Sequence, residues 1–119
     1  MIDKNKLMML ARDWLTAWNS KDIDRLMRHY HDEIEFYSPN VVKRWSKPGG
    51  KLLGKDAVRS HLLKGFEDAN HIQFHLLGIL EGIDGIIIVY KKGIKGMGAD
   101  LVTLDDEGKV IRVMAYTNC

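Results

Sequence analysis

The sequence predicts an α+β domain in which helices pack on one face of a bent, mostly antiparallel sheet. Three segments before residue 70 carry apolar residues three and four positions apart, which is typical of amphipathic helices. After residue 70 the chain instead holds extended runs separated by glycine-containing turns, as in successive hairpins. At 119 residues and without an internal repeat, the chain is expected to form one domain, residues 1–119.

The first helix is predicted over residues 4–19, with Asp3 as its N-cap. A second, shorter helix is expected to follow directly, and Ser20 can cap it. Both helices have one apolar face that can pack on a sheet. The apolar positions are Leu7, Leu10, Ala11, Trp14, Leu15 and Trp18 in the first helix, and Ile23, Leu26, Met27 and Tyr30 in the second.

Residues 33–39 alternate in polarity and predict a strand that a proline ends. The alternation puts Ile34, Phe36 and Ser38 on its buried face. Residues 45–54 contain one proline and three glycines, so we expect a loop or an irregular edge there. The strand therefore connects the two N-terminal helices to this irregular segment.

A third helix is predicted over residues 55–66, again from helical spacing of its apolar side chains. One histidine lies on that apolar side, which makes it a candidate for facing the protein interior. The positions concerned are Ala57, Val58, His61, Leu62 and Phe66.

Residues 71–82, 84–106 and 108–118 form three extended runs that predict the antiparallel strands. Hairpin turns are expected at residues 82–85 and 105–108. Glycines at 93, 96 and 98 interrupt the middle run, as expected for a bend, a bulge or a second hairpin. Both alternating faces of these runs are apolar. One face would carry the helices, and a symmetric dimer partner is the simplest cover for the other.

Composition is that of an ordinary soluble globular protein, with 45% apolar and 29% charged residues and a net charge of +2. Neither nucleic acid nor membrane is therefore an expected partner. The N-terminal apolar run at residues 7–11 is too short for a signal-peptide core or a membrane span, so a cytoplasmic location is expected. The single cysteine, Cys119, excludes an intramolecular disulfide and is not expected to act as a nucleophile.

Two local features could indicate an anion-binding site or a metal site. Residues 37–65 contain seven Lys or Arg residues but only one acidic residue, Asp56. We interpret this basic stretch as a solvated surface, and an anion-binding site is the alternative. His29 and His31 are two positions apart and face opposite sides of a helix, and no second pair of ligands supports them. We therefore expect no metal site.

Asp100 is the most informative residue of the late strands. It shares its side of the strand with Val102 and Leu104, so a carboxyl group lies on an apolar face. Burying a carboxylate is unfavourable unless it is hydrogen-bonded, paired or protonated. Asp100 is thus expected to face a pocket and act as an acid or base, or else to be a structural carboxylate bound by an indole or backbone N–H.

Three stretches together resemble a known family: WLTAWNSKDIDRLMRHYHDEIEFYSP, GKDAVRSHL and ADLVTLDDEGKVIRVMAY. They are similar to the SnoaL-like and ketosteroid-isomerase-like branch of the nuclear transport factor 2-like superfamily. The resemblance implies a cone-shaped fold in which three N-terminal helices pack on a strongly curved sheet around an apolar pocket. It also implies a homodimer and a range of functions, from isomerases, cyclases, dehydratases and hydrolases to binding domains without chemistry.

The resemblance can be carried over residue by residue. Asp100 matches the late-strand aspartate of both ketosteroid isomerase and the SnoaL-like cyclases. The isomerase's catalytic tyrosine falls on Trp14 and its base on Ser38, so isomerisation by that mechanism is not expected. In the cyclases the aspartate is the acid/base with a histidine companion, and His61 is the best candidate for that companion.

We therefore predict a small-molecule-binding protein that needs no cofactor and takes a compact apolar ligand with carbonyl or hydroxyl groups. Its activity as an acid/base enzyme of isomerase, cyclase, dehydratase or hydrolase type is one interpretation. The alternative is a non-catalytic dimeric binding or association domain. The side chains of Trp14 and Trp18, which lie on one face of the first helix, can either pack in the core or form the wall of a ligand cavity. The predicted catalytic residues are Asp100 and His61, and the predicted ligand-binding residues are Trp14, Trp18, Tyr30, Phe36, Ser38, Leu62, Val102 and Val113.

Overall fold

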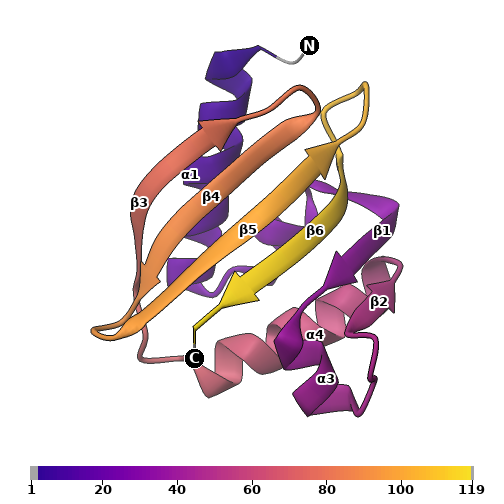
Figure 1. Cartoon of the computed structure of the whole chain (residues 1–119), viewed down its shortest axis with the longest axis vertical. Coiled ribbons are helices and arrows are strands. Elements are labelled where there is room, and N and C mark those ends of the chain that lie inside the picture. The colour runs from indigo at the N-terminus through magenta and orange to yellow at the C-terminus, as the bar shows by residue number, and fades with distance from the viewer. Residues whose placement is uncertain (1–2, 119) are drawn as a thin grey trace.

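The computed structural model describes residues 3–118 and confirms the α+β class, with four helices on a curved six-stranded sheet (Figure 1). Cys119 lies outside the described residues. Among the described residues, no helix is both long and apolar enough to cross a membrane. The elements in chain order are α1 (Lys4–Ser20), α2 (Ile23–Met27), β1 (Tyr30–Tyr37), α3 (Pro39–Trp45), β2 (Lys51–Leu53), α4 (Lys55–Asp68), β3 (Phe74–Glu81), β4 (Gly85–Lys92), β5 (Gly96–Leu104) and β6 (Val110–Thr117).

The strands are ordered β2-β1-β6-β5-β4-β3, and every neighbouring pair is antiparallel except β1 and β6. Figure 1 shows α1 crossing behind β3 and β4, while α4 lies beside β1 and β2. Three consecutive hairpins connect β3 to β6. The turns at 82–85 and 105–108 were predicted as hairpins, and of the bend, bulge or hairpin expected from Gly93 onward the structure has the hairpin. The parallel β1–β6 pair joins the first strand to the last strand of the chain.

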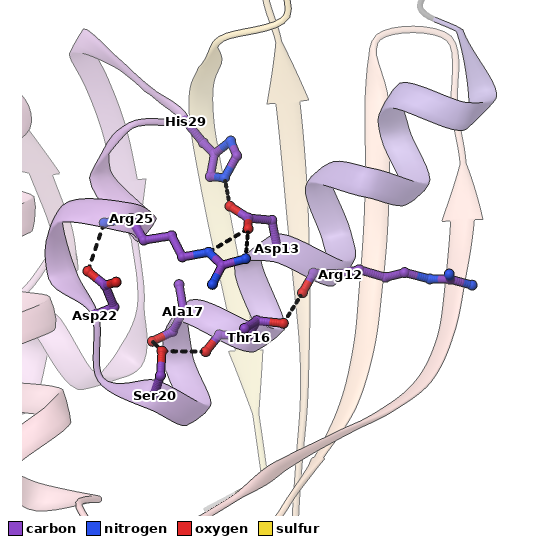
Figure 2. Close-up of polar contacts among 8 residues, drawn as sticks. All are labelled: Arg12, Asp13, Thr16, Ala17, Ser20, Asp22, Arg25 and His29. Carbon is purple, nitrogen blue, oxygen red and sulfur yellow. Dashed lines mark hydrogen bonds and ion pairs between the residues drawn. The ribbon is translucent and has the colours of Figure 1, made fainter.

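The beginning of the chain follows the prediction for α1 and corrects it for α2. Asp3 caps α1 through a 2.8 Å hydrogen bond that its carboxylate accepts from the Asn5 backbone N–H. The cap of α2 is Asp22 and not Ser20, whose hydroxyl donates back to the Thr16 carbonyl at 2.7 Å (Figure 2). Tyr30 is not helical but begins β1, because the chain at residue 29 already pairs its backbone with β6.

A fourth helix, α3, corrects the expectation of three. Ser38 is its N-cap, with Oγ accepting from the Asn40 N–H at 3.1 Å, and Pro39 occupies the first turn. Ser46 adopts a left-handed conformation, at φ 54°, and ends the helix. The short strand β2 then pairs with β1 at the edge of the sheet, so the irregular segment includes an edge strand as predicted.

The core lies between the helices and the concave face of the sheet. Alternate residues of β4 and β5 enter it, and the intervening ones face the opposite side. On that opposite side Val89, Ala99 and Tyr116 lie in one cross-strand row, and Tyr116 is 54% exposed. The core includes Leu7, Ala11 and Trp14 of α1, Val58, Leu62 and Phe66 of α4, and Ile86, Ile88, Tyr90, Val102, Leu104, Val110 and Val113 of the sheet.

Candidate functional site

A cavity of about 310 Å³ opens between the helices and the concave face of the sheet. Aromatic and aliphatic side chains form part of its walls, and side chains with polar or charged groups form the rest. Such a combination is typical of small-molecule sites. The apolar lining includes Trp18 of α1, Phe36 of β1, Leu62 of α4 and Phe74 of β3, and the polar lining includes Ser38, Asn40, Arg44, His61, Asp68, Tyr90, Lys92 and Asp100.

Asp100 of β5 lies in the cavity wall and is 6% exposed. Tyr90 Oη, from β4, donates a 3.1 Å hydrogen bond to Asp100 Oδ1. The strand register places Tyr90 opposite Gly98, two residues before Asp100, so the phenol must cross Gly98 to reach the carboxyl group. A Cβ atom at Gly98 would be 2.7 Å from both Cζ and Oη of Tyr90. The glycine therefore makes room for the contact.

The protonation of Asp100 is set by opposing effects. Burial raises its pKa to about 7, while the hydrogen bond from Tyr90 and the positive charge of Lys92 act to lower it. Asp100 Oδ2 makes no hydrogen bond to any residue within 3–118. A carboxyl group that titrates near neutral pH and keeps one oxygen uncommitted can both accept and donate a proton.

His61 of α4 is buried, and its ring packs against Phe36 with 5.4 Å between centroids. Its Nδ1 is bonded by Trp45 Nε1 at 3.1 Å and by Arg44 Nη1 at 3.0 Å, both from α3. Burial, followed by the charge of Arg44, lowers the pKa of His61 to about 4. The imidazole is therefore neutral at physiological pH, and the structure shows no hydrogen bond between it and Asp100.

Charged side chains line the same cavity and are held by neighbours. Arg44 Nη2 forms a 2.7 Å ion pair with Asp68 of α4. Lys92 Nζ donates to Thr117 Oγ1 at 2.7 Å. Elsewhere in the basic stretch, Lys and Arg side chains meet acids: Lys51 pairs with Glu35, Lys55 with Asp32 and Arg59 with Asp24. These pairs favour the solvated-surface interpretation over an anion site.

Six of the predicted site residues line this cavity: Asp100, His61, Trp18, Phe36, Ser38 and Leu62. The hydroxyl of Ser38 is already engaged as the cap of α3. Four others, Trp14, Tyr30, Val102 and Val113, are buried in the core and do not line the cavity. Trp14 packs on Tyr90 with 5.1 Å between centroids, one helical turn deeper than Trp18.

Tyr90, Arg44, Lys92 and Phe74 line the cavity but were not predicted as site residues. The sequence indicates that Tyr90 faces inward, because it alternates with Ile86 and Ile88, and its hydroxyl is the polar group on that apolar strand face. Its contact with Asp100 depends on the β4–β5 register, which no single segment reveals. Arg44 reaches the cavity only because α3 is a helix.

A wider groove of about 550 Å³ lies along α1, beside the β5–β6 turn. Its polar end is Asp13, which binds Arg25 Nε at 2.6 Å and His29 Nε2 at 2.5 Å (Figure 2). Partial burial acts to raise the pKa of Asp13, but the hydrogen bonds from Arg25 and His29 outweigh it and lower the pKa overall. Arg25 and His29 are both hydrogen-bond partners of Asp13, so this groove presents fewer unpaired polar groups than the cavity at Asp100.

No described group of three or more His, Cys, Asp or Glu residues could hold a metal ion.

Comparison with known proteins agrees with the α+β fold described above. The family model described as the SnoaL-like domain matches residues 11–114. No curated protein sequence matches the chain. A solved SnoaL-like protein of unknown function from Burkholderia thailandensis E264 is 24% identical, with a TM-score of 0.92 over 99% of this chain and 98% of its own.

Two further solved structures are similar. One is a proposed isomerase of the SnoaL-like family from Agrobacterium tumefaciens C58, 16% identical, with a TM-score of 0.77 over 97% of this chain and 99% of its own. The other is TerC, co-crystallised with polyporic acid, 14% identical, with a TM-score of 0.76 over 95% of this chain and 92% of its own. At these identities the likeness shows the fold alone.

Proposed function

The chain belongs to the SnoaL-like domain family, and from that premise we propose that it binds a compact apolar small molecule in the cavity beside Asp100. We further propose that it acts on this ligand by acid/base chemistry without a cofactor, as an isomerase, cyclase, dehydratase or hydrolase would. The observation that carries the proposal is the buried Asp100, which lines the cavity with one oxygen uncommitted and a pKa of about 7.

The cavity supports a small ligand. Its volume of about 310 Å³ is at the lower end of the usual range for ligand pockets, and Trp18, Phe36 and Phe74 give it aromatic walls. A planar or alicyclic ring with one or two oxygens would fit these walls by apolar contact. Asp100 would then meet the ligand at the polar side of the cavity.

In the proposed reaction the Asp100 carboxylate removes a proton from a carbon or hydroxyl next to a carbonyl group and later returns it. The Tyr90 hydroxyl, bonded to Oδ1, orients the carboxyl group and leaves Oδ2 for the ligand. The A. tumefaciens neighbour is a proposed isomerase, which is compatible with such a proton transfer.

A non-catalytic binding domain is the second candidate, and two residues favour it. Ser38, at the isomerase's base position, is occupied in capping α3, and Trp14, at the catalytic tyrosine's position, is packed in the core. A homodimer through the outer sheet face fits both candidates. Support comes from two outward cross-strand rows, Ile87–Leu101–Met114 and Val89–Ala99–Tyr116, which are apolar over three adjacent strands.

Exchange of α-hydrogens in deuterated water tests the proposed chemistry. A panel of cyclic ketones and enones is incubated with the wild type, with Asp100→Asn and with Asp106→Asn, an exposed carboxylate in the β5–β6 turn. We expect faster exchange with the wild type and Asp106→Asn, and loss of the acceleration with Asp100→Asn. Binding without accelerated exchange by the wild type would instead favour the non-catalytic domain.

A further inference from the structure

The ring of His61 is held by two donors from the same short helix. Trp45 Nε1 and Arg44 Nη1 lie 3.1 Å and 3.0 Å from His61 Nδ1, and Arg44 Nη1 also contacts the His61 carbonyl at 3.3 Å. An indole N–H and a guanidinium N–H can only donate. The Nδ1 atom must therefore be an acceptor without a proton, which puts the proton of the neutral ring on Nε2.

The donors themselves are anchored. The Arg44 guanidinium is fixed by its 2.7 Å ion pair with Asp68, on the last turn of α4. Trp45 is the last residue of α3, which the left-handed Ser46 ends. His61 and Asp68 are both on α4, so α3 and α4 together form a clamp around the imidazole. Removing one donor leaves the other in place.

The opposite nitrogen of the ring is available to a ligand. Nε2 makes no hydrogen bond to a residue between 3 and 118, and no fully buried side-chain nitrogen or oxygen in that range lacks a partner. Nε2 is consequently accessible, and His61 lines the cavity. Because burial and Arg44 lower the pKa of His61 to about 4, the ring stays neutral in the range where Asp100 titrates.

We infer that His61 Nε2–H is the hydrogen-bond donor to a carbonyl oxygen of the ligand, and that Arg44 and Trp45 are positioning residues that hold His61 in this form. The inference rests on the proposed function of the cavity and narrows its ligand class to compact apolar ketones and enones. The N–H of His61 requires an acceptor on the ligand, which a carbonyl oxygen provides. Asp100 Oδ2 would then face the acidic hydrogen on the carbon next to that carbonyl group.

The resulting proton transfer is balanced. Asp100 Oδ2 takes the proton from the carbon next to the carbonyl group, and the C–H electron pair forms the carbon–carbon double bond of an enolate. The carbonyl π pair moves to the oxygen, whose negative charge the His61 N–H stabilises. Asp100 then returns the proton to the same or to a conjugated carbon, so no oxidant or reductant is needed.

Nitrogen NMR of histidine-labelled protein tests the first half of the inference. We expect His61 in the wild type to carry its proton on Nε2, and the ring to become a mixture of tautomers in the double variant Arg44→Gln/Trp45→Phe. His75→Gln, an exposed histidine on β3, is the matched control for assignment and folding. A proton on Nδ1 of His61 in the wild type would overturn the inference.

Addition of cyclohex-2-enone tests the second half. We expect the His61 Nε2–H signal to move on saturation, and His61→Phe to lower the turnover number for α-hydrogen exchange by roughly 100-fold. His61→Gln, which keeps an N–H donor, should recover part of that loss. Bound cyclohex-2-enone without a change at His61, or unchanged turnover in His61→Phe, would overturn the inference. A moved His61 signal without any exchange would support the donor role and refute the proposed Asp100 chemistry.

Discussion

The Tyr90 hydroxyl reaches Asp100 across Gly98, an inner position of β5 that has no side chain. Tyr90 Oη lies 3.1 Å from Asp100 Oδ1, and the strand register sets Gly98 directly opposite Tyr90. The aromatic ring is further fixed by Phe74, stacked with 4.9 Å between centroids. The carboxyl group is thus held by a rigid neighbour, and the absence of a Cβ at Gly98 is a condition for that contact.

Gly98→Ala should displace the Tyr90 ring and destabilise the protein by about 1 to 3 kcal/mol, since the new Cβ would be 2.7 Å from Tyr90 Oη and the ring cannot move freely in the core. Urea unfolding followed by circular dichroism measures the change. Gly78→Ala, with no atom within 4 Å of the added Cβ, is the matched control and should alter stability much less. Equal effects of the two substitutions would contradict the assigned role of Gly98.

Ser38→Ala should lower stability by about 1 kcal/mol, because it removes the N-cap of α3, and should leave α-hydrogen exchange intact. Ser60→Ala, exposed on α4, serves as the control for the change of residue type. Thermal unfolding and the exchange assay are measured on the same samples. Loss of exchange in a variant whose stability is unchanged would show that Ser38 takes part in the chemistry.

The stability of the protein should depend on pH through two opposing groups. Burial raises the pKa of Asp100 from 3.8 to about 7, so its contribution to stability is present below pH 3.8 and is lost as pH rises to 7. Burial and Arg44 lower the pKa of His61 from 6.5 to about 4. Between these two pH values the unfolded state binds the proton and the folded state does not, so the free energy of unfolding increases as pH rises from 4 to 6.5. In the wild type the two effects nearly cancel between pH 4.5 and 6.5.

Single substitutions should separate these two effects. In Asp100→Asn the free energy of unfolding should increase with pH by up to about 1.4 kcal/mol per unit between pH 4.5 and 6.5, and in His61→Gln it should decrease at a similar rate. Urea unfolding at several pH values in that interval provides the measurement. Identical pH slopes in the wild type and both variants would mean that neither group titrates as described.

The outer face of the sheet should form the dimer interface. Tyr116→Lys and Leu101→Glu each place a charge in the apolar rows, and either should weaken self-association at least tenfold in analytical ultracentrifugation. Met9→Lys, on the exposed side of α1, should have no effect, since Met9 is 70% exposed on the opposite layer. A monomeric wild type at high concentration would refute the dimer.

The fold was predictable wherever one segment contains its own signal. The long helices α1 and α4 show their apolar faces over several turns, and the hairpins carry glycines at their turns. The seven-residue helix α3 is too short for periodicity to reveal it, although Ser38 followed by Pro39 is a typical start signal. Without α3, the contacts of Arg44 and Trp45 with His61 could not be anticipated.

The candidate site was predictable only in part for a related reason. The inward direction of Asp100 follows from strand alternation, and that of His61 from the apolar side of a helix. The hydrogen bond from Tyr90 requires the register between two strands. The division between Trp18 in the cavity wall and Trp14 in the core depends on how α1 packs on the sheet. Both are properties of the assembled fold.

The pKa of Asp100 is the central quantity, and carboxyl-carbon NMR titration of the wild type measures it most directly. We expect a value about 3 units above that of a free aspartate, a further rise in Tyr90→Phe because a hydrogen bond to the carboxylate is lost, and a change on addition of cyclohex-2-enone. Tyr116→Phe, at an exposed position, should leave it unchanged. A pKa at or below the ordinary value, unaffected by Tyr90→Phe and by the enone, would mean that Asp100 is a structural carboxylate and would contradict the proposed acid/base function.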